Sequence, residues 1–560
     1  MSAAPARRAP RIVFNSDGDI HFRGLRSADD MAGFYRGIDE LAGTQVDCYC
    51  YCISAGGDTY RHPSEVAPLL GADLETLDGV PHYLRRDIEN MRALLASGVD
   101  PLVLLPRRAR VHGMEFWASM RMNDIHDDYP ECAAYHGGFR KAHPELLLGS
   151  PYPEPRHRGN WRSGFCWGLD YARPEVRSRQ LALIGDVLTR YDLDGFELDF
   201  LRGAYYFRTD ERRAGLPLMT GFVRDVRALV DRAGEGKGRP LTLAIRVGRD
   251  VAECESSGLD VRTWAAEGLA DLLIPMWAGR MDTEADVAGM AALARTAELS
   301  GTRVAGGLVG SAYGYGILPD HDTGLWCNAT PEMLRAGAMA YFSQGAACTY
   351  LFNYDCQRLH GLGKPYSHGE LQALREIGDA AALVRLNKRY TITVDGSLSV
   401  EEGAGDGPVA GDEGWRMQLP ALLSGAGDAG VFRLWIGDDL AQAWRDDVLD
   451  AVRIRITADG YRAPDDAIEL AVNRTPVACD HNAWRPHGLL YTLYASRRMR
   501  GLPFGYERED DAAEGAAQGP PDLLRVGRNE LTITVRKRRE DAGPLLITGI
   551  EVLINYDGGE

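Results

Sequence analysis

The chain has 560 residues and a mass of 61.5 kDa, which is enough for two or three domains. Its 63 basic and 80 acidic residues give a formal net charge of −17, which disfavours general nucleic-acid binding because that requires a basic surface. With 45% hydrophobic and 26% charged residues, a folded soluble protein is expected. The sequence contains no run of about 18 apolar residues, so no membrane span is predicted.

The N-terminal segment Met1–Arg8 is basic, and no apolar stretch follows it before Arg11. A secretory signal needs such an apolar stretch. The sequence therefore predicts a cytoplasmic protein.

Short apolar segments recur through the first two thirds of the chain, and helical patterns lie between them. The predicted strands are Arg11–Asn15, Gln45–Ser54, Met114–Met122, Leu193–Phe200, Leu241–Val247, Asp271–Met276, Thr302–Leu308 and Cys348–Asn353. Eight strands with interleaved helices predict a (β/α)8 barrel over residues 1–388. A doubly wound sheet is the alternative, but the run Asn15-Ser-Asp-Gly-Asp after the first strand is not the glycine-rich fingerprint of a nucleotide site.

After Lys388 the pattern changes to strands alone. Segments such as Tyr390-Thr-Ile-Thr-Val and Glu530-Leu-Thr-Ile-Thr-Val alternate or are β-branched, and turns rich in Gly and Asp separate them. This pattern predicts an antiparallel β-sandwich over residues 389–560. We expect it to pack on the barrel or to form a contact in a homo-oligomer, rather than to bind sugar.

The fourth predicted strand is the most informative segment. The period-two alternation of a strand places Phe196, Leu198 and Phe200 on one face and Glu197 and Asp199 on the face toward the barrel lumen. Burying two carboxylates is costly unless they have partners. Binding or catalysis is the functional interpretation, and a structural ion pair with Arg202 or Arg246 is the alternative.

The run Asp194-Gly-Phe-Glu-Leu-Asp-Phe resembles the fourth-strand signature of barrel glycoside hydrolases. The wider segment from Leu169-Asp-Tyr-Ala-Arg-Pro-Glu-Val-Arg to this strand is similar to bacterial glycosyl-hydrolase-like proteins, as is Met114-Glu-Phe-Trp-Ala-Ser-Met-Arg-Met-Asn-Asp at the third strand. The resemblance covers roughly residues 10–385 and implies a (β/α)8 barrel that cleaves glycosidic bonds. It does not indicate the substrate.

Two types of glycoside hydrolase can be compared with this strand. In the α-amylase type the nucleophile is the Asp of an Arg-x-Asp. Asp199 matches that Asp, but Glu197 stands in place of the Arg. The chitinase type has a Glu two residues beyond the matching Asp, and Leu201 occupies that position here. A chitinase mechanism is therefore disfavoured, and Asp199 remains the best candidate for a catalytic carboxylate.

Glycoside hydrolysis usually needs a second carboxyl across the scissile bond. Glu197 lies about 6.5 Å from Asp199 along the strand, but both project from the same wall, so a partner from another strand is favoured. We rank Asp250 after the fifth strand first, and Asp355 and Glu253 next. Glu197 itself is the acid if the strand end twists.

Other polar and aromatic residues follow the predicted strands and are candidates for holding a sugar by hydrogen bonds or by stacking. Arg121 is also expected to pair with Glu197 or Asp199 and to lower the pKa of that carboxylate. The substrate-binding candidates are Arg121, Asn123, Asp124, His126, Arg202, Tyr205, Arg246, Trp277, Asn353 and Asp355.

The sequence thus predicts a glycoside hydrolase with Asp199 as nucleophile or charge stabiliser and Asp250 as proton donor. Its partner is a carbohydrate, and no cofactor or metal is expected. A carbohydrate-binding protein without catalysis is one alternative. A metal-dependent hydrolase built on Asn123, Asp124, His126 and either Asp17 or Asp19 is another, because Asp and His are metal ligands.

Overall fold

The computed structural model describes residues 9–27, 29–54, 56–125, 134–135, 137–149, 165–202, 205–277, 281, 283–296, 301–313, 326–355, 366–393, 418–479, 481–482, 488–496 and 523–559. Eight parallel strands close a barrel in the order β1-β10-β7-β6-β5-β4-β3-β2. They are β1 Ile12–Ser16, β2 Val46–Cys52, β3 Glu115–Arg121, β4 Gly195–Asp199, β5 Thr242–Val247, β6 Leu272–Pro275, β7 Arg303–Val309 and β10 Cys348–Phe352. Each of the eight predicted strands is confirmed, and so is the barrel.

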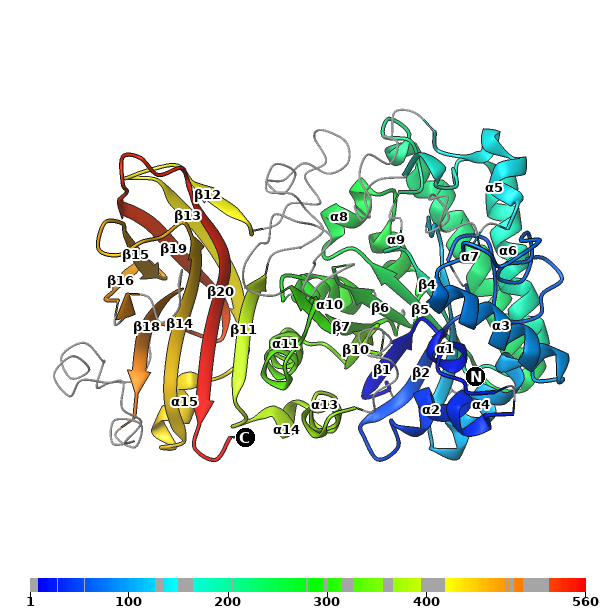
Figure 1. The fold of residues 1–560 in the computed structure, drawn as a ribbon, viewed down its shortest axis with the longest axis horizontal. Helices are drawn as coiled ribbons and strands as arrows, with labels where there is room; N and C mark the ends of the chain where they lie inside the picture. The colour runs from blue at the N-terminus through cyan, green and yellow to red at the C-terminus, as the bar shows by residue number, and fades with distance from the viewer. Residues whose placement is uncertain are drawn as a thin grey trace.

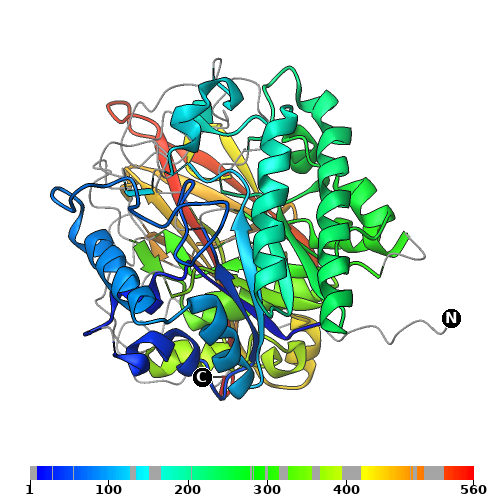
Figure 2. The ribbon, with the colours of Figure 1, turned by 90° about the vertical axis from the view of Figure 1, so that its right-hand side faces the viewer.

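Helices surround this barrel, and the two longest, α6 and α7, lie side by side on its outside (Figure 2). The helices of this part are α1 Ile20–Arg23, α2 Met31–Asp39, α3 His82–Ala96, α4 Pro101–Val111, α5 Phe139–Ala142, α6 Pro174–Arg190, α7 Arg212–Lys237, α8 Val251–Ser256, α9 Val261–Ala266, α10 Val287–Thr296, α11 Pro331–Ser343, α13 His368–Leu374 and α14 Ala380–Leu383. Two 3-10 turns, η2 Pro144–Leu146 and η3 Phe165–Trp167, precede α6, and a small ladder joins β8 Ser311–Tyr313 to β9 Trp326–Asn328. In the part of the chain that the structure describes, no helix is both long and apolar enough to cross a membrane.

The C-terminal part contains two antiparallel sheets that share one hydrophobic core, as predicted. The first has the order β11-β20-β14-β18-β17, with β12 also paired to β20, and the second has the order β13-β19-β15-β16. The elements are β11 Lys388–Thr393, β12 Ala421–Leu423, β13 Ala429–Ile436, α15 Leu440–Arg445, β14 Leu449–Asp459, β15 Ala467–Val472, β16 Thr475–Val477, β17 His481–Asn482, β18 Gly488–Ala495, β19 Gly527–Lys537 and β20 Leu545–Tyr556.

Helix α11 lies between the barrel and the C-terminal sheets (Figure 1). Leu334 and Tyr341 on this helix belong to the barrel core, whereas Ala336 and Ala340 belong to the core of the sheets. Contact is close enough that a Cβ on Gly437, just after β13, would lie 2.4 Å from the backbone oxygen of Met339. Helix α11 thus contributes side chains to both hydrophobic cores. This holds the C-terminal sheets against the barrel, as predicted.

The Asp-Gly pair that begins the fourth-strand motif has a structural explanation. The Asp194 carboxylate accepts a hydrogen bond from the backbone N–H of Phe116 at 3.0 Å and pairs with Arg110 and Arg239. At Gly195 a Cβ would lie 2.7 Å from the ring of Trp117. These contacts hold the start of β4 against β3, and they thereby set the height at which Glu197 and Asp199 stand in the barrel.

Candidate functional site

The strand register brings polar side chains of three neighbouring strands together at the carboxyl end of the barrel. In the strand register, Asp199 on β4 stands beside Arg121 on β3 and beside Arg246 on β5. One layer deeper in the barrel, Glu197 stands beside Ser119 on β3 in the strand register. Because side chains of parallel strands alternate between faces, both carboxylates face the lumen, as the alternation predicts.

Asp199 forms a buried ion pair with Arg246. The Arg246 Nη1 donates to both carboxylate oxygens, at 2.9 and 2.8 Å, and Oδ1 also accepts from the backbone N–H of Leu201 at 2.9 Å. The guanidinium is fully buried and lies 3.6 Å above the Phe352 ring. Arg246, one of the two partners that the structural interpretation considered, therefore forms an ion pair with Asp199.

Glu197 is also fully buried, but the hydrogen bonds to it are neutral. Its Oε1 accepts from the Ser119 hydroxyl at 2.6 Å and from the Asn15 amide at 3.2 Å. Its Oε2 has no hydrogen-bond partner among the described residues. Burial, followed by the charge of Asp199, raises the pKa of Glu197 to about 7. Asn15 and Ser119 were not predicted, although each faces the lumen at a strand position that alternation could have identified.

Arg121 does not pair with Glu197 or Asp199, and that prediction was wrong. Its guanidinium binds Asp17, just after β1, and Asp124, at 3.1 Å, in the loop after its own strand. The ion-pair partners of Arg121 are therefore these two aspartates. The bridge links the loops after β1 and β3 across the mouth of the barrel.

The loop after β5 holds the predicted proton donor, Asp250. Its Oδ1 accepts from the backbone N–H of Glu253 at 2.8 Å, so Asp250 caps helix α8. Glu253 pairs with Arg249 at 2.9 Å, and the Arg249 guanidinium lies 4.7 Å from the centre of the Trp277 ring. A structural role accounts for each of these contacts, and whether Asp250 or Glu253 donates a proton stays a prediction.

Several predicted substrate-binding residues are engaged with the protein itself. The Asn123 amide donates to the backbone oxygens of Leu169 and Tyr205 and accepts from the N–H of Leu169. Tyr205 and Trp277 are each 1% exposed, and the Trp277 ring lies against Arg249. The side chain of Arg202 is placed among the charges of Arg121, Asp124 and Asp17, and burial lowers its pKa.

At the end of β10, Asp355 is 1% exposed and accepts a hydrogen bond from the Ser16 hydroxyl at 2.5 Å. Asn353 has a φ of 50°, which few residues other than glycine adopt, and such strain is common at functional sites. Of the predicted site residues, His126 lies outside the described residues. The structure thus brings Asp199, Glu197 and Arg246 into one cluster, and Arg121 and Asp124 into a second beside it.

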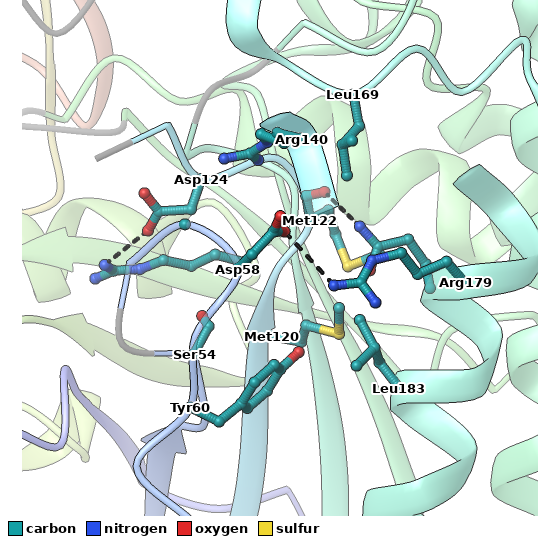
Figure 3. Close-up of a pocket in the computed structure, with 13 residues that line it drawn as sticks. Ser54, Asp58, Tyr60, Met120, Met122, Asp124, Arg140, Leu169, Arg179 and Leu183 are labelled. Carbon is teal, nitrogen blue, oxygen red and sulfur yellow. Dashed lines mark hydrogen bonds and ion pairs between the residues drawn. The ribbon is translucent and has the colours of Figure 1, made fainter. Parts of the chain in front are cut away.

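A small cavity lies behind β3, on the side away from Glu197. Figure 3 shows Met120 of β3 and Met122, just after this strand, facing Leu183 and Arg179 of α6, with Asp58 and Tyr60 nearby. Arg179 Nη2 lies 3.9 Å from Asp58 Oδ1. The cavity measures about 10 Å³, which is about the room that one water needs. A sugar does not fit there.

The described residues contain no group of three or more His, Cys, Asp or Glu side chains placed to hold a metal ion. Asp17 and Asp124, two of the residues of the metal-dependent alternative, are instead paired with Arg121. This pairing gives that alternative no support.

Comparison with known proteins yields no family assignment. No model of a protein family matches the sequence, and no curated protein matches it. Among solved structures, the chain has distant similarity to glycoside hydrolase barrels. The PgaB (BpsB) glycoside hydrolase domain from Bordetella bronchiseptica is 13% identical, with 67% of this chain and 99% of that chain covered and a TM-score of 0.38.

Two further structures are similar at the same level. The GH36 alpha-galactosidase AgaB from Geobacillus stearothermophilus is 12% identical, with 95% of this chain covered and a TM-score of 0.34, and this chain spans 56% of its length. Alpha-L-fucosidase isoenzyme 2 from Paenibacillus thiaminolyticus is 14% identical, with 71% of this chain and 53% of that chain covered and a TM-score of 0.38. The assignment of a function therefore rests on the geometry of the site.

Proposed function

We propose that this protein is a glycoside hydrolase whose reaction centres on Asp199. The observation that supports the proposal is the buried ion pair between Asp199 and Arg246 at the carboxyl end of β4 and β5, the end at which (β/α)8 barrels carry their active sites. A transition state with positive charge on the sugar needs a fixed negative charge beside it. Asp199 supplies that charge as nucleophile or stabiliser, and its 1% exposure keeps bulk water from weakening the interaction.

Asp250 is the proposed proton donor. It follows β5, the strand next to β4, and it is half-buried at the rim of the barrel. Its Oδ1 caps helix α8, and no ion pair to it is formed among the described residues. By contrast, Asp17 and Asp124 are both ion-paired with Arg121, and Glu253 is ion-paired with Arg249.

The first experiment measures hydrolysis of a panel of aryl α- and β-glycosides and polysaccharides by the wild type and by Asp199→Asn. We expect a loss of several orders of magnitude in kcat/KM in the variant. Asp194→Asn is the matched control, because it removes a paired carboxylate at the opposite end of the same strand. Equal cleavage by wild type and Asp199→Asn would contradict the assignment.

The second experiment tests the donor with Asp250→Asn. Asparagine caps helices as well as aspartate does, so the variant keeps α8 and loses only the acid. We expect slow hydrolysis of alkyl glycosides and near-normal hydrolysis of dinitrophenyl glycosides, whose leaving group needs no proton. Asp260→Asn, the equivalent cap of α9, is the control. Loss on both substrate types, or on neither, would reject Asp250.

A carbohydrate-binding protein without catalysis is the second candidate, and the capping role of Asp250 favours it. This candidate predicts binding of an oligosaccharide in calorimetry with no cleavage by the wild type. Cleavage that depends on Asp199 would exclude it.

A further inference from the structure

The two buried carboxylates of β4 accept hydrogen bonds from different donors. Arg246 donates to both oxygens of Asp199, and the hydrogen bonds to Glu197 come from Ser119 and Asn15. The cation on the other side, Arg121, is bound by Asp17 and Asp124. The positive charge of Arg246 offsets one negative charge on this pair of carboxylates.

The groups that face Glu197 from β1, β2, β3 and β10 are neutral, whereas Arg246 on β5 acts on it through its positive charge. Cys50 on β2 and Tyr350 on β10 both lie near its carboxyl, and burial raises the pKa of each well above its usual value. Asn15 on β1 and Ser119 on β3 do not titrate. Oε2 of Glu197 accepts no hydrogen bond within the described part of the chain. Burial costs the carboxylate anion more than the neutral acid, and this cost outweighs the interactions with Ser119 and Tyr350, which favour the anion.

We propose that Glu197 is a positioning residue that stays protonated beneath Asp199, so that the pair holds one negative charge and Arg246 confines that charge to Asp199. The effect on catalysis rests on the proposed function, but the protonation does not. When Glu197 loses its proton, its carboxylate competes with that of Asp199 for Arg246. Arg246 is then drawn from Asp199, and the reactive carboxylate loses its fixed orientation.

An infrared pH titration tests the protonation directly and needs no substrate. The spectrum of Glu197→Gln is subtracted from that of wild type labelled with ¹³C-glutamate. We expect a protonated-carboxyl band that disappears with a midpoint near pH 7. Glu376→Gln, which removes a buried glutamate paired with Arg335, controls for nonspecific changes. A midpoint near 4.5, the ordinary value, or the absence of the band would overturn the proposal.

A second variant keeps the test decisive if Glu197→Gln folds poorly. Ser119→Ala removes a hydroxyl that donates to Oε1 and so favours the ionised form. We expect the midpoint of the band to rise above that of the wild type. An unchanged or lower midpoint would show that Glu197 is not the group that titrates.

The role in catalysis is tested by the pH profile of glycoside hydrolysis. Wild-type activity is expected to fall as pH rises above about 7, whereas in Glu197→Gln this alkaline decline disappears, because glutamine stays neutral. A decline that persists unchanged in Glu197→Gln would overturn the positioning role. If no glycoside is cleaved but the infrared band titrates near pH 7, the proposed function fails and the protonation stands.

Discussion

Asp199 and Arg246 are 47 residues apart in the chain, yet they form a salt bridge of 2.8 Å inside the barrel because they stand at the same register position on neighbouring parallel strands. Neither side chain is more than 1% exposed. Solvent therefore does not screen the attraction between the two groups, and each group compensates the buried charge of the other.

Replacing Arg246 by methionine should strongly destabilise the protein, because Asp199 is left as an uncompensated buried charge. Removal of one partner of a buried pair typically costs about 3–5 kcal/mol. Denaturant unfolding should show this loss. The double variant Arg246→Met with Asp199→Asn should recover part of the stability, and a double variant no more stable than Arg246→Met would show that Asp199 is not the source of the penalty.

Stability should depend on pH through Glu197. Its folded-state pKa of about 7 lies above the ordinary value of 4.5, so the folded protein holds this proton more tightly than the unfolded chain does. The free energy of unfolding therefore falls as pH rises from about 4.5 to about 7, by up to roughly 3 kcal/mol for a shift of this size. Denaturant unfolding of Glu197→Gln over this range should lack that decline. A parallel decline in wild type and variant would assign it to another group.

His62 should make the protein sensitive to acid. It is fully buried between the rings of Tyr60 and Tyr191, and neither ring nitrogen has a hydrogen-bond partner among the described residues. Burial lowers the pKa of His62 to about 3. The stability that comes from keeping this ring neutral is fully present above pH 6.5 and is lost as pH falls toward 3, by about 1.4 kcal/mol per pH unit.

His62→Phe should therefore stabilise the protein by about 1–2 kcal/mol at neutral pH, since it removes two unpaired buried nitrogens, and it should flatten the acid limb. His21 is the contrasting control. Both of its ring nitrogens are paired, with the backbone oxygen of Phe34 and the hydroxyl of Tyr49, so His21→Phe should destabilise. Thermal unfolding at pH 7 and pH 5 distinguishes the two. A destabilised His62→Phe would mean that its ring nitrogens are satisfied in solution.

Asp438 anchors the C-terminal sheets beside α11. Its carboxylate accepts hydrogen bonds from the hydroxyls of Tyr390 and Tyr556 and pairs with the buried Lys388 at 2.9 Å. Asp438→Asn leaves the Lys388 charge unpaired, so we expect a loss of about 3–5 kcal/mol. Asp446→Asn, which breaks an exposed pair with Arg385, should change stability little. Equal effects of the two substitutions would contradict the anchoring role.

The sequence was sufficient for the fold because the signals that define it are local. Each barrel strand is buried on both faces and appears as a short apolar run, and the alternation within β4 put Glu197 and Asp199 on the lumen face before any partner was known. The run Asp250-Val-Ala-Glu253 also carried a helix-capping pattern that could have been recognised in the sequence.

The partners of these charges were decided only by the tertiary structure. Arg246 meets Asp199, and Asp17 meets Arg121 across 104 residues of chain, because the closure of the barrel and its register bring distant strand ends together. Sequence spacing contains no such distances, so it assigned Arg121 to the wrong carboxylates. The sequence also could not show that Glu197 and Asp199, two carboxyl side chains of one strand, have different surroundings. Asp199 is ion-paired with Arg246, whereas burial raises the pKa of Glu197 to about 7.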